Sequence, residues 1–171
     1  FVGRVLLNSF NAWEYGWECN REDLKANSTK IFDSYLKNGF TEAGFFKESV
    51  NFDKNSEDPV HSIRRQSEGL YAIFHFLAYE KEKGRKHPEW EQRLKKMLDM
   101  FLQLQNADGS FPRKFRDDFT IVDKSGGSTP SATLPLVMGY KYFKDKRYLD
   151  SAKRTAEIGR ASCRERVYVL V

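Results

Sequence analysis

Residues 58–68 bring together the side chains that are best suited to chemistry. The segment leads into an expected helix, and Arg64, Arg65 and Glu68 fall within the first two turns of that helix. A carboxylate can act as a general acid or base. The arginine guanidinium favours bidentate hydrogen bonding to a carboxylate, such as that of an acidic ligand. Two consecutive arginines cannot share one helix face, so at most one of them should point inward. Because Arg65 and Glu68 are three residues apart, they could instead form an internal ion pair.

Other acidic and aromatic residues provide candidate partners for Glu68. The stretch 13–18 holds two tryptophans, a tyrosine and two carboxylates, which could form a stacking wall with acid or base groups. The same stretch could equally be a connection that packs against the domain. The candidate catalytic carboxylates are Glu68, with Asp117 or Glu14 as its partner. The candidate binding residues are Trp13, Trp17, His61, Arg64, Arg65, Phe111 and Arg113.

The composition excludes several classes of protein. The 171 residues carry a formal net charge of +5, with 29 basic and 24 acidic side chains intermixed, so no basic stripe indicates nucleic-acid binding. The longest apolar run, residues 70–79, is far too short to cross a bilayer. No cluster has metal-ligand spacing, and no glycine-rich loop has a phosphate-binding form. We therefore expect no metal, no cofactor, no nucleic-acid partner and no membrane span in this segment.

Residues 158–171 do not fit the rest of the chain. The run Ile158–Val167 resembles one reading frame of a short-read sequencing adapter, and the chain begins at Phe1 without an initiator methionine. We therefore expect a natural segment of about residues 1–157, taken from an assembled read, and set 158–171 aside. A natural basic tail is the alternative. Without three arginines and one glutamate of the tail, the formal net charge falls from +5 to +3, and Cys19 is the only cysteine left.

Apolar periodicity predicts five helices, preceded by a connection over residues 1–20 from a region upstream. The expected helices span about residues 23–38, 62–83, 88–105, 130–143 and from 147 onward. The first, third and fifth have a one-sided apolar stripe, whereas the second and fourth are apolar on nearly all sides. Ser62 should cap the second helix and Pro130 should open the fourth. The chain is thus expected to be all-α. Amphipathic outer helices should alternate with inner helices that are apolar on nearly all sides.

The connections between these helices alternate in length. Two are tight turns, whereas residues 39–61 and 106–129 form long loops, which are usually functional in compact domains. If the apolar helices form an inner layer, both long loops must lie at the rim where the inner helices begin. Helix N-termini at that mouth would gather backbone N–H groups and positive dipole ends. Such a mouth suits a ligand with hydroxyl groups and negative charge.

Two loop sequences complete this layout. Gln105–Phe115 reads Gln-Asn-Ala-Asp-Gly-Ser-Phe-Pro-Arg-Lys-Phe, and Gly126–Ala132 reads Gly-Gly-Ser-Thr-Pro-Ser-Ala. With the alternating helices, they make the chain resemble the six-hairpin glycosidase superfamily, which includes unsaturated glucuronyl hydrolases. The α/α-toroid polysaccharide lyases share this architecture. The resemblance covers about residues 21–157, roughly two and a half of six hairpins, and implies a partial α/α toroid. No diagnostic catalytic motif of one of these families maps onto the chain, so the resemblance assigns no catalytic residue.

The resemblance implies a carbohydrate-active protein. We expect a glycoside hydrolase that acts on a polysaccharide or oligosaccharide, with uronic acids as candidate sugars, through two carboxylates at the mouth. The fragment alone should be inactive, and the resemblance favours the bacterial periplasm or cell surface. A polysaccharide lyase, with His61 or Tyr71 as base, stays open, as does a glycan-binding toroid without catalysis. The run 105–111 also faintly resembles the repeat of terpenoid-cyclase toroids, but Asp117–Asp118 is the nearest approach to an aspartate-rich motif.

Overall fold

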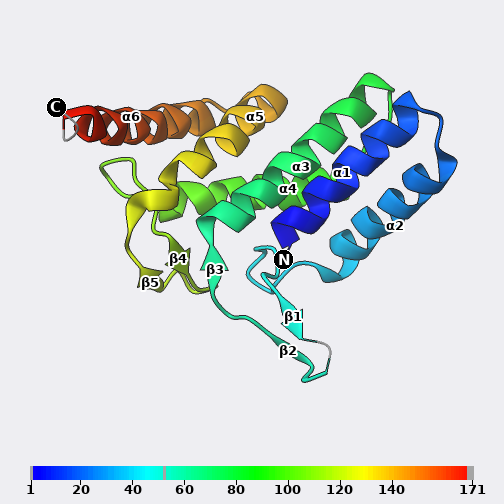
Figure 1. The fold of residues 1–171 in the computed structure, drawn as a ribbon, viewed down its shortest axis with the longest axis horizontal. Coiled ribbons are helices and arrows are strands. Elements are labelled where there is room, and N and C mark those ends of the chain that lie inside the picture. The colour runs from blue at the N-terminus through cyan, green and yellow to red at the C-terminus, as the bar shows by residue number, and fades with distance from the viewer. Residues whose placement is uncertain (1, 52, 169–171) are drawn as a thin grey trace.

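The computed structural model describes the backbone of residues 2–51 and 53–168, and the side chains of residues 3–51 and 53–158. Six α-helices in three successive hairpins dominate it (Figure 1). The helices are α1 (Val2–Glu18), α2 (Glu22–Asn38), α3 (Ile63–Glu82), α4 (Pro88–Leu104), α5 (Thr133–Phe143) and α6 (Lys146–Tyr168). A 3-10 helix, η1 (Gly126–Ala132), precedes α5. The predicted all-α class and the alternation of helices are confirmed.

The first helix corrects the sequence analysis, which treated residues 1–20 as a connection. Leu6, Phe10 and Trp13 of α1 are spaced four and three residues apart, and all three are buried. This is the spacing of a helical stripe, and it was hidden by the aromatic and charged residues that share the segment. α1 packs along α3 and pairs with α2. The structure therefore contains three complete helical hairpins, not two and a half.

The three odd-numbered helices form one layer. α3 lies between α1 and α5, and all three run in the same direction (Figure 1). α3 buries residues on most of its surface, as its apolar composition predicts. The one-sided stripe predicted for α4 is also confirmed, since Trp90, Leu94 and Phe101 are each almost fully buried. The inner layer is therefore α1, α3 and α5, with α2, α4 and α6 as their outer partners.

Short strands join the two long loops at the rim where the inner helices begin (Figure 1). Within the first long loop, β1 (Val50–Asn51) pairs with β2 (Ser56–Glu57). The strands β3 (His61–Ser62), β4 (Lys114–Phe115) and β5 (Ile121–Asp123) form an antiparallel sheet in the order β3-β4-β5. Because β3 ends the first loop and β4 and β5 belong to the second, the register His61↔Phe115 ties the two loops together. The predicted convergence of the long loops is confirmed.

The opposite rim carries the tight turns. Cys19–Arg21 connects α1 to α2, and Lys83–His87 connects α3 to α4, with Gly84 in the left-handed region at φ +75°. Glycine adopts this conformation without the steric cost of a Cβ, which suits a helix end. The fourth expected helix starts later than predicted, because Pro130 lies inside η1 and α5 begins only at Thr133. Among the described residues, no helix is long and apolar enough to cross a membrane.

Candidate functional site

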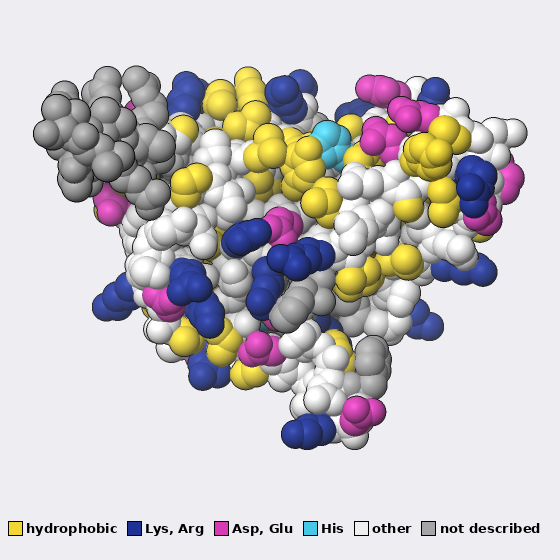
Figure 2. Space-filling model, viewed as in Figure 1, with side chains coloured by type: hydrophobic (Ala, Val, Ile, Leu, Met, Phe, Trp, Pro, Cys, Tyr) yellow, Lys and Arg dark blue, Asp and Glu magenta, His cyan; other side chains and the backbone are white. Residues whose placement is uncertain are grey.

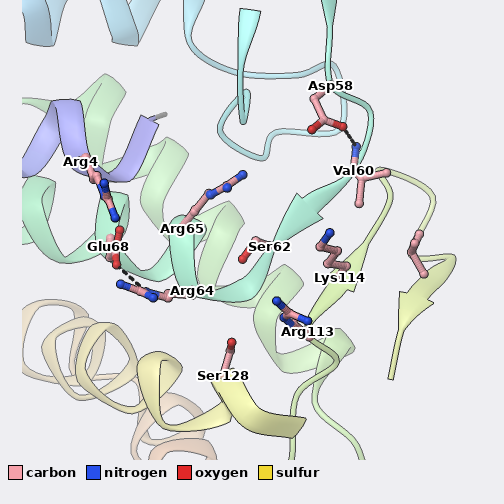
Figure 3. A pocket seen from close by; sticks show the side chains of 11 residues that line it. Arg4, Asp58, Val60, Ser62, Arg64, Arg65, Glu68, Arg113, Lys114 and Ser128 are labelled. Atoms are coloured by element: carbon pink, nitrogen blue, oxygen red, sulfur yellow. Dashed lines mark hydrogen bonds and ion pairs between the residues drawn. The ribbon is translucent and has the colours of Figure 1, made fainter. Parts of the chain in front are cut away.

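A cavity of about 520 Å³ opens at the rim where α1 and α3 begin (Figure 3). Side chains from α1, from α3, from both long loops and from η1 surround it. The lining residues are Arg4, Asp58, Val60, Ser62, Arg64, Arg65, Glu68, Arg113, Lys114, Val122 and Ser128. We call this space the mouth cavity. It contains four of the ten predicted site residues, namely Glu68, Arg64, Arg65 and Arg113.

Basic side chains outnumber acidic ones in the mouth cavity. Five of the lining residues are Arg or Lys, against Asp58 and Glu68. Figure 2 shows these cationic groups gathered over the start of α3 and the adjoining strand. Within the described part of the chain, Arg4 and Lys114 make no ion pair, and Arg113 makes an exposed one with Asp123 (3.2 Å). The cavity thus presents net positive charge beside the N-terminus of α3, which favours an anionic group.

The two arginines at the start of α3 both reach the mouth cavity, which corrects the expectation that only one could. The side chains of Arg64 and Arg65 extend in different directions from the first turn of α3, and both line the cavity (Figure 3). The ion pairs also differ from the Arg65–Glu68 pair that the spacing allowed as an alternative. Arg64 Nε donates to Glu68 Oε1 at 2.9 Å, and Arg65 Nη1 donates to Glu48 Oε2 at 3.2 Å. The i, i+4 spacing of Arg64 and Glu68 gives the better approach on a helix.

Glu48, which was not among the predicted residues, supports the mouth cavity from behind Arg65. Its side chain is fully buried, and it accepts hydrogen bonds from the Ser62 N–H (2.7 Å), Gln66 Nε2 (3.0 Å) and Arg65 Nη1. A buried carboxylate needs such donors, because its desolvation is costly. Glu48 thereby binds the backbone at the start of α3, while the Ser62 side chain, predicted as the cap, makes no capping bond and lines the cavity. An acidic residue two positions after Phe45–Phe46 was the available signal.

His61 and Asp117 lie in a neighbouring cavity of about 390 Å³ on the other side of β3. His61 Nε2 is 2.8 Å from Asp117 Oδ1, and that oxygen also accepts from the Thr41 hydroxyl at 2.8 Å. Successive residues of a strand point to opposite faces, so His61 faces away from the cavity that Ser62 lines. Asp117 therefore lines a different cavity from Glu68, the carboxylate that it was expected to partner. Asp58 lines both spaces.

The imidazole of His61 is held among aromatic rings. The ring centroids of Phe45 and Phe115 lie 5.1 and 5.5 Å from that of His61. The side chain is 1% exposed, and within the described part of the chain its Nδ1 has no hydrogen-bond partner. An aspartate on one ring nitrogen with the other nitrogen unpaired is the arrangement of an oriented base. His61, the candidate base, is thus well oriented, but its imidazole is enclosed by the neighbouring aromatic rings.

Trp13, Trp17 and Glu14 lie away from the mouth, which corrects the expectation that they would line it with Glu68. α1 begins at the mouth and ends at the opposite rim, so the aromatic stretch near its end is carried to that rim. Trp13 is buried and packs edge-on against Phe76 at 5.2 Å. Glu14 is close enough to His75 to affect its titration, and it does not line the mouth cavity. The residue pattern of 13–18 does not by itself reveal which rim this stretch reaches, because that depends on the direction of α1.

Phe111 is a core residue and not a ligand platform. The side chain is fully buried, its ring lies 5.9 Å from that of Phe101, and its backbone N–H donates to the Thr129 hydroxyl at 2.9 Å. The loop does approach the mouth, as predicted, but Phe111 serves to fasten it to α4 and η1. Among the residues that the structure describes, no group of three His, Cys, Asp or Glu side chains could hold a metal ion.

The fold is that of part of an α/α toroid. The structure is similar to cellobiose 2-epimerase from Bacillus thermoamylovorans B4167, with a TM-score of 0.74 at 16% identity over 90% of this chain and 39% of the other. It is also similar to an unsaturated glucuronyl hydrolase from Bacillus sp. GL1, described as responsible for glycosaminoglycan degradation (TM-score 0.67, 14% identity, 90% and 43% covered).

A D-mannose isomerase is a further structural neighbour, with a TM-score of 0.60 at 18% identity over 90% of this chain and 42% of the other. All three are six-hairpin α/α-toroid enzymes. The chain spans about two fifths of the length of each of these proteins. No protein-family model matches the sequence.

Proposed function

We propose that the complete protein is a carbohydrate-active enzyme that binds an acidic sugar at the mouth cavity and hydrolyses a glycosidic bond there. The observation that carries this proposal is the mouth cavity itself, in which five basic side chains surround the carboxylates Asp58 and Glu68. The toroid neighbours act on or are named for sugars, which supports a carbohydrate substrate. Cationic side chains at a helix N-terminus suit the carboxylate of a uronic acid.

Two carboxylates in one cavity are what glycoside hydrolysis requires. One protonates the leaving oxygen, and the other activates water or attacks the sugar carbon. We assign the base or nucleophile role to Glu68, because Arg64 holds its carboxylate at 2.9 Å. We assign the acid role to Asp58, which replaces Asp117 and Glu14 as the proposed partner. Arg4 and Lys114, which have no ion-pair partner within the described residues, would bind the acidic group of the substrate.

Turnover of uronic-acid oligosaccharides by the complete protein tests this function. Release of new reducing ends reports hydrolysis, whereas absorbance from a new unsaturated bond reports a lyase. Glu68→Gln should lower kcat at least about 100-fold and change KM little, since loss of an acid or base group costs about that much. Glu57→Gln, an exposed residue outside the mouth cavity, is the matched control and should keep full activity. Normal turnover by Glu68→Gln would reduce Glu68 to a structural partner of Arg64.

Proton transfer on a sugar carbon is a second candidate function, and the His61–Asp117 pair favours it. Asp117 engages Nε2, so the unpaired Nδ1 is the nitrogen that would accept a proton. Two of the structural neighbours are named as an epimerase and an isomerase. Incorporation of deuterium from heavy water into recovered sugar distinguishes this reaction from hydrolysis. We expect that His61→Gln would abolish any such exchange, whereas Glu68→Gln would leave it detectable.

A further inference from the structure

A separate cavity of about 300 Å³ lies at the rim opposite the mouth, between the α1–α2 and α3–α4 hairpins. The lining residues are Trp13, Trp17, Thr29, Phe32, Asp33, Leu36, Phe76, Glu80, Arg85, His87 and Trp90. We call this space the far-rim cavity. Sixteen residues of α3 separate Arg64 at the mouth from Glu80 here, a distance of about 24 Å along a helix axis. Both hairpins that build it are complete in this structure.

The floor of the far-rim cavity is aromatic. Phe32, Phe76 and Trp90 are each at most 5% exposed, and Trp13 closes the same surface. Trp17 stands at the edge and is 41% exposed, with Lys25 Nζ lying 4.2 Å from its ring centroid. The Arg85 guanidinium also lies over this ring, at 5.5 Å, and both cations favour its position at the rim. A floor of rings with a tryptophan at the edge suits the flat, apolar face of a small ring-shaped ligand.

The rim of the far-rim cavity offers fixed polar groups. The buried carboxylate of Glu80 accepts from Arg85 Nε at 2.8 Å and lies 2.9 Å from His87 Nε2. Burial alone would raise the pKa of Glu80, but the hydrogen bonds from Arg85 and His87 outweigh it and lower the pKa. In the described part of the chain, Arg85 Nη1, His87 Nδ1 and the carboxylate of Asp33 make no hydrogen bond, and all three residues line the cavity.

We propose that the far-rim cavity binds a neutral hexose unit of a glycan. Its lining carries the carboxylates of Asp33 and Glu80 and the guanidinium of Arg85, so it lacks the positive field of the mouth. Hydrogen-bond donors and an acceptor that line the same cavity as an aromatic floor match the ring hydroxyls and apolar face of a sugar. The proposal extends the proposed function, because a glycan held about 24 Å from the mouth would be retained between reaction events.

Binding of neutral oligosaccharides to the complete protein, measured by calorimetry, tests this site. Gluco-, galacto- and manno-oligosaccharides are the probes. Asp33→Ala and Trp17→Ala each remove a rim group that is exposed, so the fold should survive, and each should weaken binding at least about tenfold. Tyr15→Ala is the matched control, because Tyr15 is an exposed aromatic residue on the same helix that does not line the cavity. It should bind as the unaltered protein does.

Variants at the mouth separate failure of this site from failure of the proposed function. Arg64→Ala should leave neutral-oligosaccharide binding unchanged, whether or not the protein hydrolyses uronic acids. Retention of full affinity by both Asp33→Ala and Trp17→Ala would overturn the proposal. So would loss of neutral-sugar binding in Arg64→Ala, since the sugar would then occupy the mouth. Absence of binding by all three oligosaccharide series at millimolar concentration would overturn it as well.

Discussion

Gly3 of α1 lies directly against Glu68 of α3. A Cβ placed on Gly3 would lie 2.8 Å from the Cβ of Glu68 and 2.7 Å from the carbonyl oxygen of Arg65. The close approach of these two backbones brings Arg4 to the same cavity as Glu68 (Figure 3). The first helix therefore helps to shape the candidate site, although the sequence analysis assigned its residues to a connection.

Gly3→Ala should separate these helices and destabilise the protein. Alanine gains about 1 kcal/mol of helix propensity over glycine, but overpacking of this contact should cost about 1–3 kcal/mol. We expect a net loss of up to about 2 kcal/mol in the free energy of unfolding, measured by urea titration. Gly127→Ala is the control, because no atom lies within 4 Å of a Cβ there, and its effect should stay within about 0.5 kcal/mol. A more stable Gly3→Ala variant would contradict the close contact.

Glu48→Ala should be among the most damaging single substitutions in this chain. It removes the acceptor of the Ser62 N–H and one acceptor each of Arg65 and Gln66, so the cost should be about 1–3 kcal/mol of unfolding free energy. Glu48→Gln should cost less, because its amide oxygen can still accept from the Ser62 N–H. The comparison variant is Glu57→Ala, which breaks an exposed ion pair with Lys47 and should cost about 0–1 kcal/mol. Equal stability losses for the Glu48 and Glu57 variants would disprove the role of Glu48.

The titration of His75 should make the stability of the protein depend on pH. Burial lowers the pKa of His75, and the nearby Glu14 opposes this shift only partly. The rings of Phe10 and Tyr71 also face the imidazole, at 5.2 and 4.4 Å. Because the folded pKa is below the unfolded value of about 6.5, the contribution is present above that pH and is lost as the pH falls toward the folded pKa.

His75→Phe should remove this dependence. Between about pH 6.5 and 5, the unfolding free energy of the unaltered protein should fall more steeply than that of the variant, because only the former takes up a proton at this position on unfolding. Urea titrations at intervals across this range measure both slopes. Parallel curves would show that His75 does not contribute.

Removal of residues 158–171 should leave the stability of the chain almost unchanged. The resemblance of this run to a sequencing adapter predicts that it was not selected to pack against the preceding helices. The side chains of 159–171 lie outside the described residues, so deletion is the direct test. We expect the thermal midpoint of a chain ending at residue 157 to lie within about 2 °C of that of the 171-residue chain. A drop of about 10 °C would indicate a natural tail.

The sequence by itself determined the helices that have a clear apolar pattern and the end at which the chain places its long loops. The stripe Trp90, Leu94 and Phe101 predicted α4, and the alternation of long and short connections predicted that the loops 39–61 and 106–129 converge. These features are local or follow from connectivity, because up-and-down helices with short turns at one end must carry long connections at the other. Arg64, Arg65 and Glu68 were placed correctly for the same reason, since they belong to the first turns of α3.

The tertiary structure decided which side chains meet across elements. The sequence could not show that Glu48 bonds to the start of α3, that Asp117 joins His61 and not Glu68, or that α1 carries Trp13 and Trp17 to the far rim. The physical reason is that each of these relations depends on strand register or helix direction. A shift of one residue in β3 would exchange the faces of His61 and Ser62, and only the packed sheet fixes that register.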